Sequence, residues 1–575
     1  MEKAKKLLLI TSLILLSGCN LNFNRSGSYS GASSNNVSST SSINISNENN
    51  TSKVESSTTS NVVTSSTNIT TSSSSSFVAP TIKSTIVLHN LDQIYSFEIE
   101  GEFFNYNDIP EFSFEDRTIT GWYFDELFYE EIEEGVYYAI ESVLDIFAKV
   151  EYNYKYFIKD FLIDSVARIN INTENEKVVN TKEEYTNATF EIIDNKIREN
   201  NFAETSIRIK CRGNSSFVNA HLQGQPFENS KFSYKIKFDT KQDLFGFGKD
   251  KEWNLIANFM DRSFIRNHLV YSLSKLMNNL EFTIEHKYVE LYLNGKYNGL
   301  YLLTESVKTG SNRVDIEEPF TAEDSEIPFM LEQDQKALED GSIEGVDYFW
   351  SHRGLPFSTK YPDTFSSETI TSAQYKYIRN KLNELYDNVS NENYEKYLDV
   401  NSFIDYFMVQ EIFRNVDVNH SSVYLYKRVG EPFKMGPIWD FDLSMGNYDY
   451  IDNQPDKFLK SLVGGGGNYL YNTLMAKSKF KNAYLERFKF VKDIYLKAMQ
   501  EALPEIKESL RNYADRDYDK WETLGNNVDC LANNPVLVGI KSFDGHVDYI
   551  ENYMFKGLNG YKGRINWLNE YLQFY

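Results

Sequence analysis

Two aspartates on either side of a predicted β-hairpin constrain the fold of this chain more than any other feature. Asp417 follows a segment in which apolar side chains recur at helical spacing, at Ile404, Met408 and Ile412. The residues after Asp417 alternate in the manner of a strand, turn at a Gly-Glu-Pro sequence, and return as an apolar run that leads to Asp440. The predicted order is therefore a helix, a loop that carries one carboxylate, a hairpin, and a second carboxylate at a strand end.

Protein kinases present their two essential carboxylates in this order, one on the catalytic loop and one that binds metal. For Asp440 and Asp442 the alternative is a turn after a buried strand, with the neighbouring Trp439 and Phe441 as core residues. The pattern alone leaves both interpretations open.

The composition is that of a large globular protein with an acidic surface. The chain has 575 residues, 41% of them apolar and 15% aromatic, and a formal net charge of -23. Such a chain has room for two or three domains. The negative charge argues against a nucleic-acid partner, because phosphate binding needs clustered Lys and Arg. It favours basic peptides or divalent cations instead.

Residues 1–19 have the pattern of a secretion signal. Three lysines precede an apolar run, Leu7 to Leu16, that is too short to span a bilayer. The Leu-Ser-Gly-Cys sequence that follows resembles a bacterial lipobox, which implies cleavage before Cys19 and lipid attached to that residue. We therefore expect anchoring to the cell membrane on its extracellular face. The alternative is an ordinary signal peptide with an accidental cysteine.

Composition divides the rest of the chain into three parts. Residues 20–79 are rich in Ser, Thr and Asn and predict a disordered stalk, because they cannot bury enough apolar surface to fold. Residues 80–155 predict a small β module; the sequence from Gly121 to Tyr123 resembles the turn of an internalin B-type repeat, with an unrelated β module as the alternative. Residues 160–575 predict one α+β domain, a β-rich lobe followed by an α-rich lobe.

Polar residues in the β-rich part are candidates to hold phosphates. They are Arg212, Asn214 and Ser215 in a Gly-containing turn, and Lys231, Lys235 and Lys237 in a strand-like run. Lys235 and Lys237 alternate with apolar residues, so they share one face of the strand. A solvated lysine face on a half-exposed strand is the alternative.

Two further carboxylates lie next to predicted structural elements. Asp261 precedes an amphipathic helix that runs through Leu276, and we expect it to cap that helix rather than to take part in catalysis. Glu305 ends a segment that alternates around an Asn-Gly pair, which predicts a hairpin. Glu305 either contacts a nucleotide or merely caps the strand. The two cysteines Cys211 and Cys530 form either one bridge or two buried thiols.

Seven motifs occur in order along the large domain. They are Arg-Gly-Asn-Ser-Ser, Lys-x-x-Tyr-Lys-Ile-Lys-Phe-Asp, Trp-Asn-Leu-x-Ala-Asn-x-x-Asp, Arg-Asn, Leu-Asn-Gly-x-Tyr-x-Gly-x-Tyr-x-x-x-Glu, Asn-x-Asp and Gly-Pro-x-Trp-Asp-Phe-Asp. Together they resemble the CotH kinase family, named for spore coat protein H, over nearly the whole domain. The resemblance implies an atypical protein-kinase-like fold of two lobes. It also implies transfer of the ATP γ-phosphoryl group to Ser or Thr of a protein.

The same resemblance implies roles for the acidic residues. Asp417 matches the catalytic-loop Asp of the family and Asp440 its metal-binding Asp, and Asp442 and Asn419 are close enough in sequence to support the metal or the phosphates. Mg²⁺ or Mn²⁺ takes carboxylate oxygen, and Asp417 would orient the proton of the acceptor hydroxyl. Like the family, the chain lacks the kinase Gly-rich loop. The candidate phosphate-binding residues would replace that loop; they are Arg212, Asn214, Ser215, Lys231, Lys235 and Lys237.

A non-catalytic surface adhesin or binding protein on a kinase-like scaffold is the alternative to an enzyme. The stalk and the repeat-like module suit attachment, and ATP is scarce outside a cell. A polysaccharide-binding role follows only from the expected location. The sequence leaves the protein substrate and the oligomeric state open.

Overall fold

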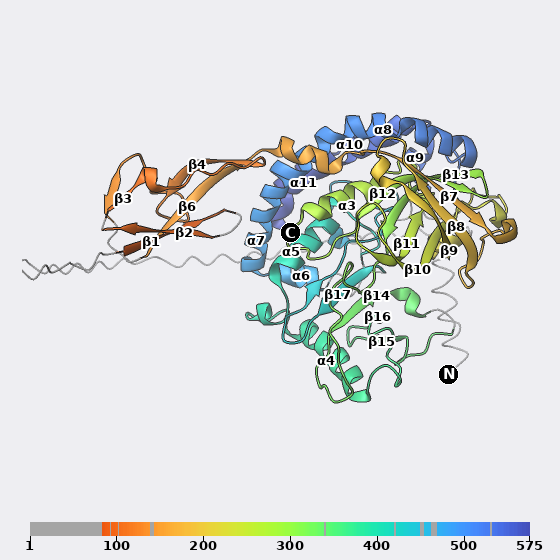
Figure 1. Ribbon diagram of the computed structural model, residues 1–575, viewed down its shortest axis with the longest axis horizontal. Helices are drawn as coiled ribbons and strands as arrows, with labels where there is room; N and C mark the ends of the chain where they lie inside the picture. Colours follow the sequence, from red (N-terminus) through yellow and green to blue (C-terminus); the bar gives the residue numbers. More distant parts are fainter. Residues whose placement is uncertain are drawn as a thin grey trace, which may run out of the picture. The chain divides into compact units, whose positions relative to one another are not determined.

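The chain has a mixed α+β architecture, with a β-rich region first, then a β-barrel, then a second sheet and the C-terminal helices (Figure 1). This confirms the predicted α+β class. The computed structural model describes residues 83–91, 94–101, 103–138, 143–338, 341–418, 421–448, 454–461, 469–528 and 532–575. Two compact units divide the chain: the first consists of the residues up to Pro110 and Trp122–Ala148, and the second of Glu111–Gly121 and Lys149–Tyr575.

A small mixed β-sheet precedes the barrel along the chain. Its strands are β1 (Lys83–His89), β2 (Tyr95–Glu100), β4 (Arg117–Tyr123) and β6 (Val143–Tyr152), in the order β2-β1-β6-β4, with a separate ribbon of β3 (Phe103–Asn105) and β5 (Val136–Tyr138). β1 is antiparallel to β2 and parallel to β6. Ile86 and Leu88 are both fully buried, since alternate residues of a strand point to the same face. A β-rich module is therefore present, and its kinship with internalin repeats stays a prediction.

Seven strands of the second unit close into a barrel. They are β7 (Ala167–Thr173), β8 (Thr186–Ile193), β9 (Phe202–Arg212), β10 (Ser233–Gln242), β11 (Asp250–Ile256), β12 (His286–Leu293) and β13 (Lys296–Glu305). Their order is β10-β11-β13-β12-β7-β8-β9, and pairing of β9 with β10 completes the ring. Asn294 and Gly295 both have positive φ between β12 and β13. The predicted Asn-Gly hairpin is confirmed, because such a two-residue turn requires positive φ at both positions.

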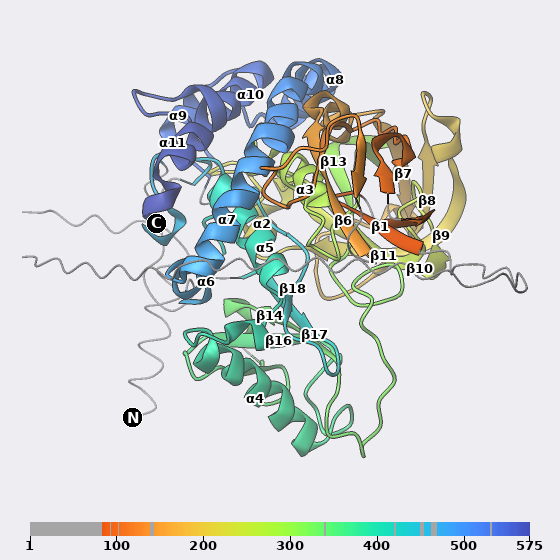
Figure 2. The ribbon, with the colours of Figure 1, turned by 90° about the vertical axis from the view of Figure 1, so that its left-hand side faces the viewer.

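A five-stranded sheet follows the barrel. Its strands are β14 (Phe329–Gln333), β15 (Tyr348–Trp350), β16 (Pro356–Tyr361), β17 (Val423–Lys427) and β18 (Lys434–Met435), in the order β15-β16-β14-β17-β18. β17 and β18 form the predicted hairpin between the two aspartates. Every residue of β17 is buried, so the alternation in its sequence separates two covered faces rather than a buried face from an exposed one. Helix α4 lies beside this sheet in Figures 1 and 2.

Helices dominate the rest of the second unit. Besides the short α2 (Ser215–Val218), they are α3 (Arg266–Leu276), α4 (Ser372–Asn388), α5 (Val400–Phe413), α6 (Tyr469–Met475), α7 (Ser478–Val491), α8 (Lys497–Trp521), α9 (Pro535–Gly539), α10 (Phe543–Glu551) and α11 (Arg564–Tyr571). The long α8 runs along the barrel, where Trp521 Nε1 donates a hydrogen bond to the carbonyl O of Asn298 at 2.9 Å (Figure 1). Within the described ranges, we find no helix with the length and hydrophobicity that crossing a membrane requires.

Candidate functional site

Asn415 ties the two aspartate loops together. α5 ends at Phe413, and Arg414 adopts left-handed backbone with φ of 50°, so the chain leaves the helix sharply. The Asn415 side chain then accepts a hydrogen bond from the N–H of Asp417 at 3.1 Å and donates one to the carbonyl O of Asp440 at 3.5 Å. The loop of the first predicted carboxylate therefore packs directly against the loop of the second.

Helix α3 holds the second loop in place. Asp440 itself has left-handed backbone, with φ of 67°. The side chain of Asn267 accepts the N–H of Phe441 at 2.9 Å, and the Arg266 guanidinium donates to the carbonyl O of Ser444 at 3.0 Å. A strained residue that is fixed on its C-terminal side by a buried helix is typical of a functional site.

Asp261 holds the start of α3 from the preceding turn, whereas the N-cap residue of that helix is Ile265 and not Asp261. Its carboxylate accepts the backbone N–H groups of Ser263 and Arg266, both at 3.0 Å, and forms an ion pair with the Arg266 guanidinium. Asp261 thereby orients the arginine that reaches the second loop.

The acidic residues form one electrostatic cluster. The pKa of Asp442 lies well above its usual value, because burial disfavours its charge and because the carboxylates of Asp440, Asp417 and Asp261 repel it, while Arg266 opposes the shift. Repulsion of this kind falls off with distance. Asp440 and Asp442 line the same pocket, and the contacts of Asn415 bring the loop of Asp417 beside that of Asp440. A divalent cation would relieve this repulsion.

The arrangement fits a cation that is only partly coordinated by protein. Across the described residues, no group of three or more His, Cys, Asp or Glu side chains forms a ready-made metal site. Mg²⁺ usually takes one or two carboxylates and completes its shell with water and phosphate oxygens. Asp440 and Asp442, both half-buried, meet that requirement.

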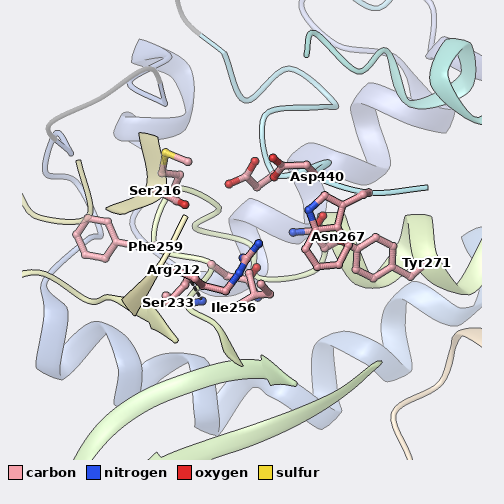
Figure 3. A pocket seen from close by; sticks show the side chains of 13 residues that line it. Arg212, Ser216, Ser233, Ile256, Phe259, Asn267, Tyr271 and Asp440 are labelled. Atoms are coloured by element: carbon pink, nitrogen blue, oxygen red, sulfur yellow. Dashed lines mark hydrogen bonds between the residues drawn. The ribbon is translucent and has the colours of Figure 1, made fainter. Parts of the chain in front are cut away.

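A pocket lies beside these carboxylates, with about 450 Å³ of space between its atoms, part of which is open to solvent. Its lining residues are Arg212, Ser216, Ser233, Ile256, Ala257, Asn258, Phe259, Met260, Asn267, Tyr271, Trp439, Asp440 and Asp442. In Figure 3, Arg212 extends toward the side on which Asp440 lies, and Phe259 is at the opposite end. Tyr271 and Trp439 stack with ring centroids 5.8 Å apart and an interplanar angle of 13°, which gives the pocket an aromatic wall.

Arg212 is the predicted cation that the structure brings to the pocket. It ends barrel strand β9, and its guanidinium lies 5.4 Å from the ring centre of Trp439. Burial lowers the pKa of Arg212, and attraction to Asp440 and Asp442 opposes that shift. Positive charge therefore faces the acidic cluster across the space where a phosphate and a cation would both be stabilised.

Asn258 is a pocket residue for which no role was predicted from the sequence. Its side chain is 4% exposed, and neither its amide nitrogen nor its amide oxygen has a hydrogen-bond partner among the described residues. Its backbone is left-handed, with φ of 49°. Buried polar groups are nearly always paired, so an unpaired amide in a pocket wall fits a ligand that supplies the partner. Its place in the Trp-Asn-Leu-x-Ala-Asn motif was the available signal.

A second group that sequence reasoning missed comes from the five-stranded sheet. Tyr424 donates to Glu332 at 2.8 Å, Glu332 pairs with Lys360, and Ser421 donates to Asp334 at 2.8 Å. The pKa of Tyr424 is well above its usual value because of burial and the nearby carboxylates, which include Asp440. These residues are scattered over three strands and the loop before β17, and no sequence motif connects them.

The remaining candidates of the Arg-Gly-Asn-Ser-Ser turn lie next to the pocket. Asn214 precedes α2 and Ser215 begins it, while Ser216 supplies the hydroxyl in the lining. Gly213 has φ of 101°, and a Cβ atom there would lie 2.2 Å from Ser216 Oγ. The glycine therefore lets Ser216 take its place in the pocket wall.

The three lysines lie away from the pocket. Lys231 is buried and donates to Asp517 Oδ2 at 2.6 Å and to the carbonyl O of Leu300 at 2.8 Å. Lys235 and Lys237 both pair with Glu252, at 2.8 and 2.9 Å, on the half-exposed face of β10. Lys231 thus joins the barrel to α8, and the other two match the solvated lysine face that was the alternative.

Glu305 lies in the wall of a different cavity, apart from the first pocket. Cys211 is a buried free thiol that donates to the carbonyl O of Val179, and burial raises its pKa to about 12. Asn419, Cys19 and Cys530 lie outside the described residues.

Comparisons with known proteins bear on the same segment. No curated protein matches the chain. A protein-family model described as CotH kinase protein matches residues 209–557, more than half of the 575 residues. The matched segment contains Arg212, both aspartate loops and the helix that holds them. This chain therefore belongs to the CotH kinase protein family, as the seven motifs predicted.

Proposed function

We propose that the chain is an atypical protein kinase that transfers the γ-phosphoryl group of ATP to Ser or Thr of a protein. The observation that carries the proposal is that Asp440 and Asp442 line one pocket with Arg212, while Asn415 ties the loop of Asp417 to that of Asp440. The barrel and the helix-rich part would act as the two lobes of a kinase-like domain. The barrel supplies Arg212 to the pocket from strand β9, and the part of the chain that follows the barrel supplies Asp440 from the loop after β18.

Each of the pocket residues would have its own role in phosphoryl transfer. Asp440 and Asp442 would hold Mg²⁺ or Mn²⁺, which when bound neutralises charge on the phosphate oxygens. Arg212 would add two parallel N–H donors to those oxygens. The amide of Asn258 would hydrogen-bond the nucleotide or a water of the metal shell, because it has no partner among the described residues. Asn419, if it assists the metal, would do so from the loop of Asp417.

Asp417 would receive or orient the proton of the acceptor hydroxyl. Its carboxylate is half-buried, so a side chain of a second protein can reach it, and the Asn415 amide fixes its backbone. A general base must lie within hydrogen-bond reach of the proton that it accepts. Its nearness to Asp442 supports this role, because the acceptor oxygen must approach the metal-bound phosphate.

The test is transfer of labelled phosphate from γ-³²P-labelled ATP by the purified full chain with Mg²⁺ or Mn²⁺, followed by mapping of the modified residues. We expect Asp417→Ala and Asp440→Ala each to lower the initial rate at least ~10²-fold. Asp239→Ala is the matched control, since Asp239 lies on the barrel surface with its side chain 76% exposed.

Equal rates in the two aspartate variants and the parent would refute the assignment. Nucleotide binding without transfer, or no nucleotide binding, would support the non-catalytic surface protein instead. Residues 20–79 are rich in Ser and Thr, so self-modification can be sought there.

We also propose that lipid on Cys19 anchors the protein to the extracellular face of the cell membrane. The support is the lipobox-like Leu-Ser-Gly-Cys sequence after a short apolar run. In a bacterial host fed an alkyne fatty acid, the parent protein should take up the label and Cys19→Ser should not. Equal labelling of both proteins would contradict the proposal.

A further inference from the structure

A second cavity lies next to the segment that joins strand β18 to Asp440. It contains about 600 Å³ of empty space, and Pro437, three residues before Asp440, is part of its wall. Its other lining residues are Glu281, Phe282, Thr283, Ile284, Glu305, Ser306, Val307, Lys308, Asn312, Arg313 and Val314. None of these residues lines the first pocket. The second cavity is therefore separate from the proposed active site.

Arg313 lines this cavity, and part of its guanidinium is without a hydrogen-bond partner among the described residues. Its side chain is 2% exposed, its Nη1 donates to Glu305, and its guanidinium carbon lies 4.7 Å from the ring centre of Trp253. The other edge, Nε and Nη2, has no hydrogen-bond partner among the described residues. Two parallel N–H groups on one edge of a guanidinium match the two oxygens of a carboxylate or a phosphate.

Two more donors belong to the same wall. The hydroxyl of Ser306 is buried and has no partner among the described residues. Lys308 contacts Asp250 at 3.5 Å and Glu252 at 3.9 Å, and its side chain is 35% exposed. A buried, unpaired guanidinium edge and hydroxyl in one cavity wall are costly unless a ligand or water accepts from them.

The acidic residues of the cavity are largely neutralised. The Glu281 carboxylate accepts two hydrogen bonds from the Arg428 guanidinium, from Nη2 at 2.9 Å and from Nη1 at 3.0 Å. Glu305 accepts from Arg313 and from the backbone N–H of Glu285, and burial raises its pKa to about 7. Two glutamates nevertheless remain in the wall, and they would repel a phosphate dianion more than a singly charged group.

We propose that this cavity is a carboxylate-binding site in which the free edge of Arg313 and the Ser306 hydroxyl receive the two oxygens. Lys308 adds a cation at the same wall. The carboxylate belongs to a small organic acid or to an acidic side chain of a peptide. The site goes beyond the proposed kinase activity and does not depend on it, because it shares no residue with the first pocket.

The test is saturation-transfer difference NMR on the full chain with acetate as the probe. We expect acetate to bind, and Arg313→Gln to weaken that binding about tenfold or more, since two charge-assisted hydrogen bonds are lost. Ser306→Ala should weaken it about threefold and leave the fold intact. Arg516→Gln is the matched control, because the Arg516 side chain is 47% exposed and pairs with Glu290.

Three further measurements establish that acetate binds in this cavity and identify the kind of carboxylate. Acetate binding should persist in Arg212→Ala, which excludes the first pocket, and melting curves should show that Arg313→Gln is folded. Arg313→Lys keeps the positive charge but not the two parallel N–H groups, and it should also bind acetate weakly. Stronger binding of an acetylated, amidated tripeptide with a central Asp would assign the site to an acidic side chain, and equal binding to a small acid.

The proposal is overturned if acetate does not bind, if Ser306→Ala and Arg313→Lys bind it as the parent does, or if ³¹P line broadening shows inorganic phosphate to bind more tightly. Loss of phosphate transfer in Asp440→Ala has no bearing on these outcomes. Failure of the carboxylate site and failure of the kinase assignment are therefore distinguishable.

Discussion

At the residue scale, Asn258 offers a direct way to ask whether the first pocket holds a ligand. Replacing it with Gly removes the unpaired amide and also relieves the left-handed backbone, which Gly adopts without strain. We expect Asn258→Gly to keep or raise the melting temperature while weakening MgATP binding about tenfold, as loss of a buried hydrogen bond would. Calorimetric titration with a non-hydrolysable ATP analogue measures the second effect.

The matched control is Asn559→Gly, the same substitution at an exposed residue that also has left-handed backbone, with φ of 51°. It should leave nucleotide binding unchanged. If both variants bind the analogue as the parent does, the amide of Asn258 has no part in nucleotide recognition.

Side chains with local partners were predictable, and those with distant partners were not. Asp261 accepts the first N–H of a helix that begins five residues later, so a structural role for it can be inferred from the adjacent sequence. Lys231 finds its carboxylate 286 residues away, and no spacing rule connects it with Asp517. Sequence alone placed Lys231 among phosphate ligands because a lysine near a glycine turn is typical of such sites.

At the element scale, the Lys231–Asp517 pair explains how the long helix α8 is joined to the barrel. Both side chains are almost fully buried, and Asp517 also accepts the backbone N–H of Leu300 on β13 at 2.7 Å. Gly299 has φ of 123°, and a Cβ atom there would lie 2.5 Å from Asp517 Oδ2. Lys231 belongs to one sequence motif and Gly299 to another. Both therefore serve the same contact, between strand β13 and helix α8.

Removing one partner of this pair should lower the free energy of unfolding more than replacing both partners with apolar residues. Asp517→Ala leaves the Lys231 ammonium buried without its carboxylate, and we expect the free energy of unfolding to fall by about 3–5 kcal/mol. The double variant Lys231→Met, Asp517→Leu should recover much of that loss, because no buried charge remains. Urea unfolding followed by circular dichroism measures both. Equal losses in the single and double variants would show that the charges do not set the cost.

Short-range patterns predicted individual elements well. The Asn-Gly pair predicted the β12–β13 hairpin, and the aspartates bracketed the β17–β18 hairpin correctly, because turn chemistry acts within a few residues. Closure of the barrel could not be predicted from the sequence. It requires β7 to lie parallel to β12 and β9 to pair with β10, contacts that depend on the assembled fold.

At the scale of the whole molecule, the first pocket is assembled from segments that are far apart along the chain. Arg212 ends a barrel strand, Asn258 and Asn267 flank the start of α3, and Asp440 follows the second sheet. Sequence motifs identified most of these segments but not the Glu332–Lys360 pair of that sheet. The division into a β-rich first part and a helical second part was predicted from composition and periodicity, which act over long windows.

Closure of the barrel also limits how another polypeptide can be captured. A peptide that joins a sheet as an extra strand needs a free edge with unpaired backbone groups, and every barrel strand already has two neighbours. The other sheet of the second unit ends in β15 and β18, which are three and two residues long. On this unit, a protein substrate of the proposed kinase activity would therefore be recognised through its side chains and not as an added strand.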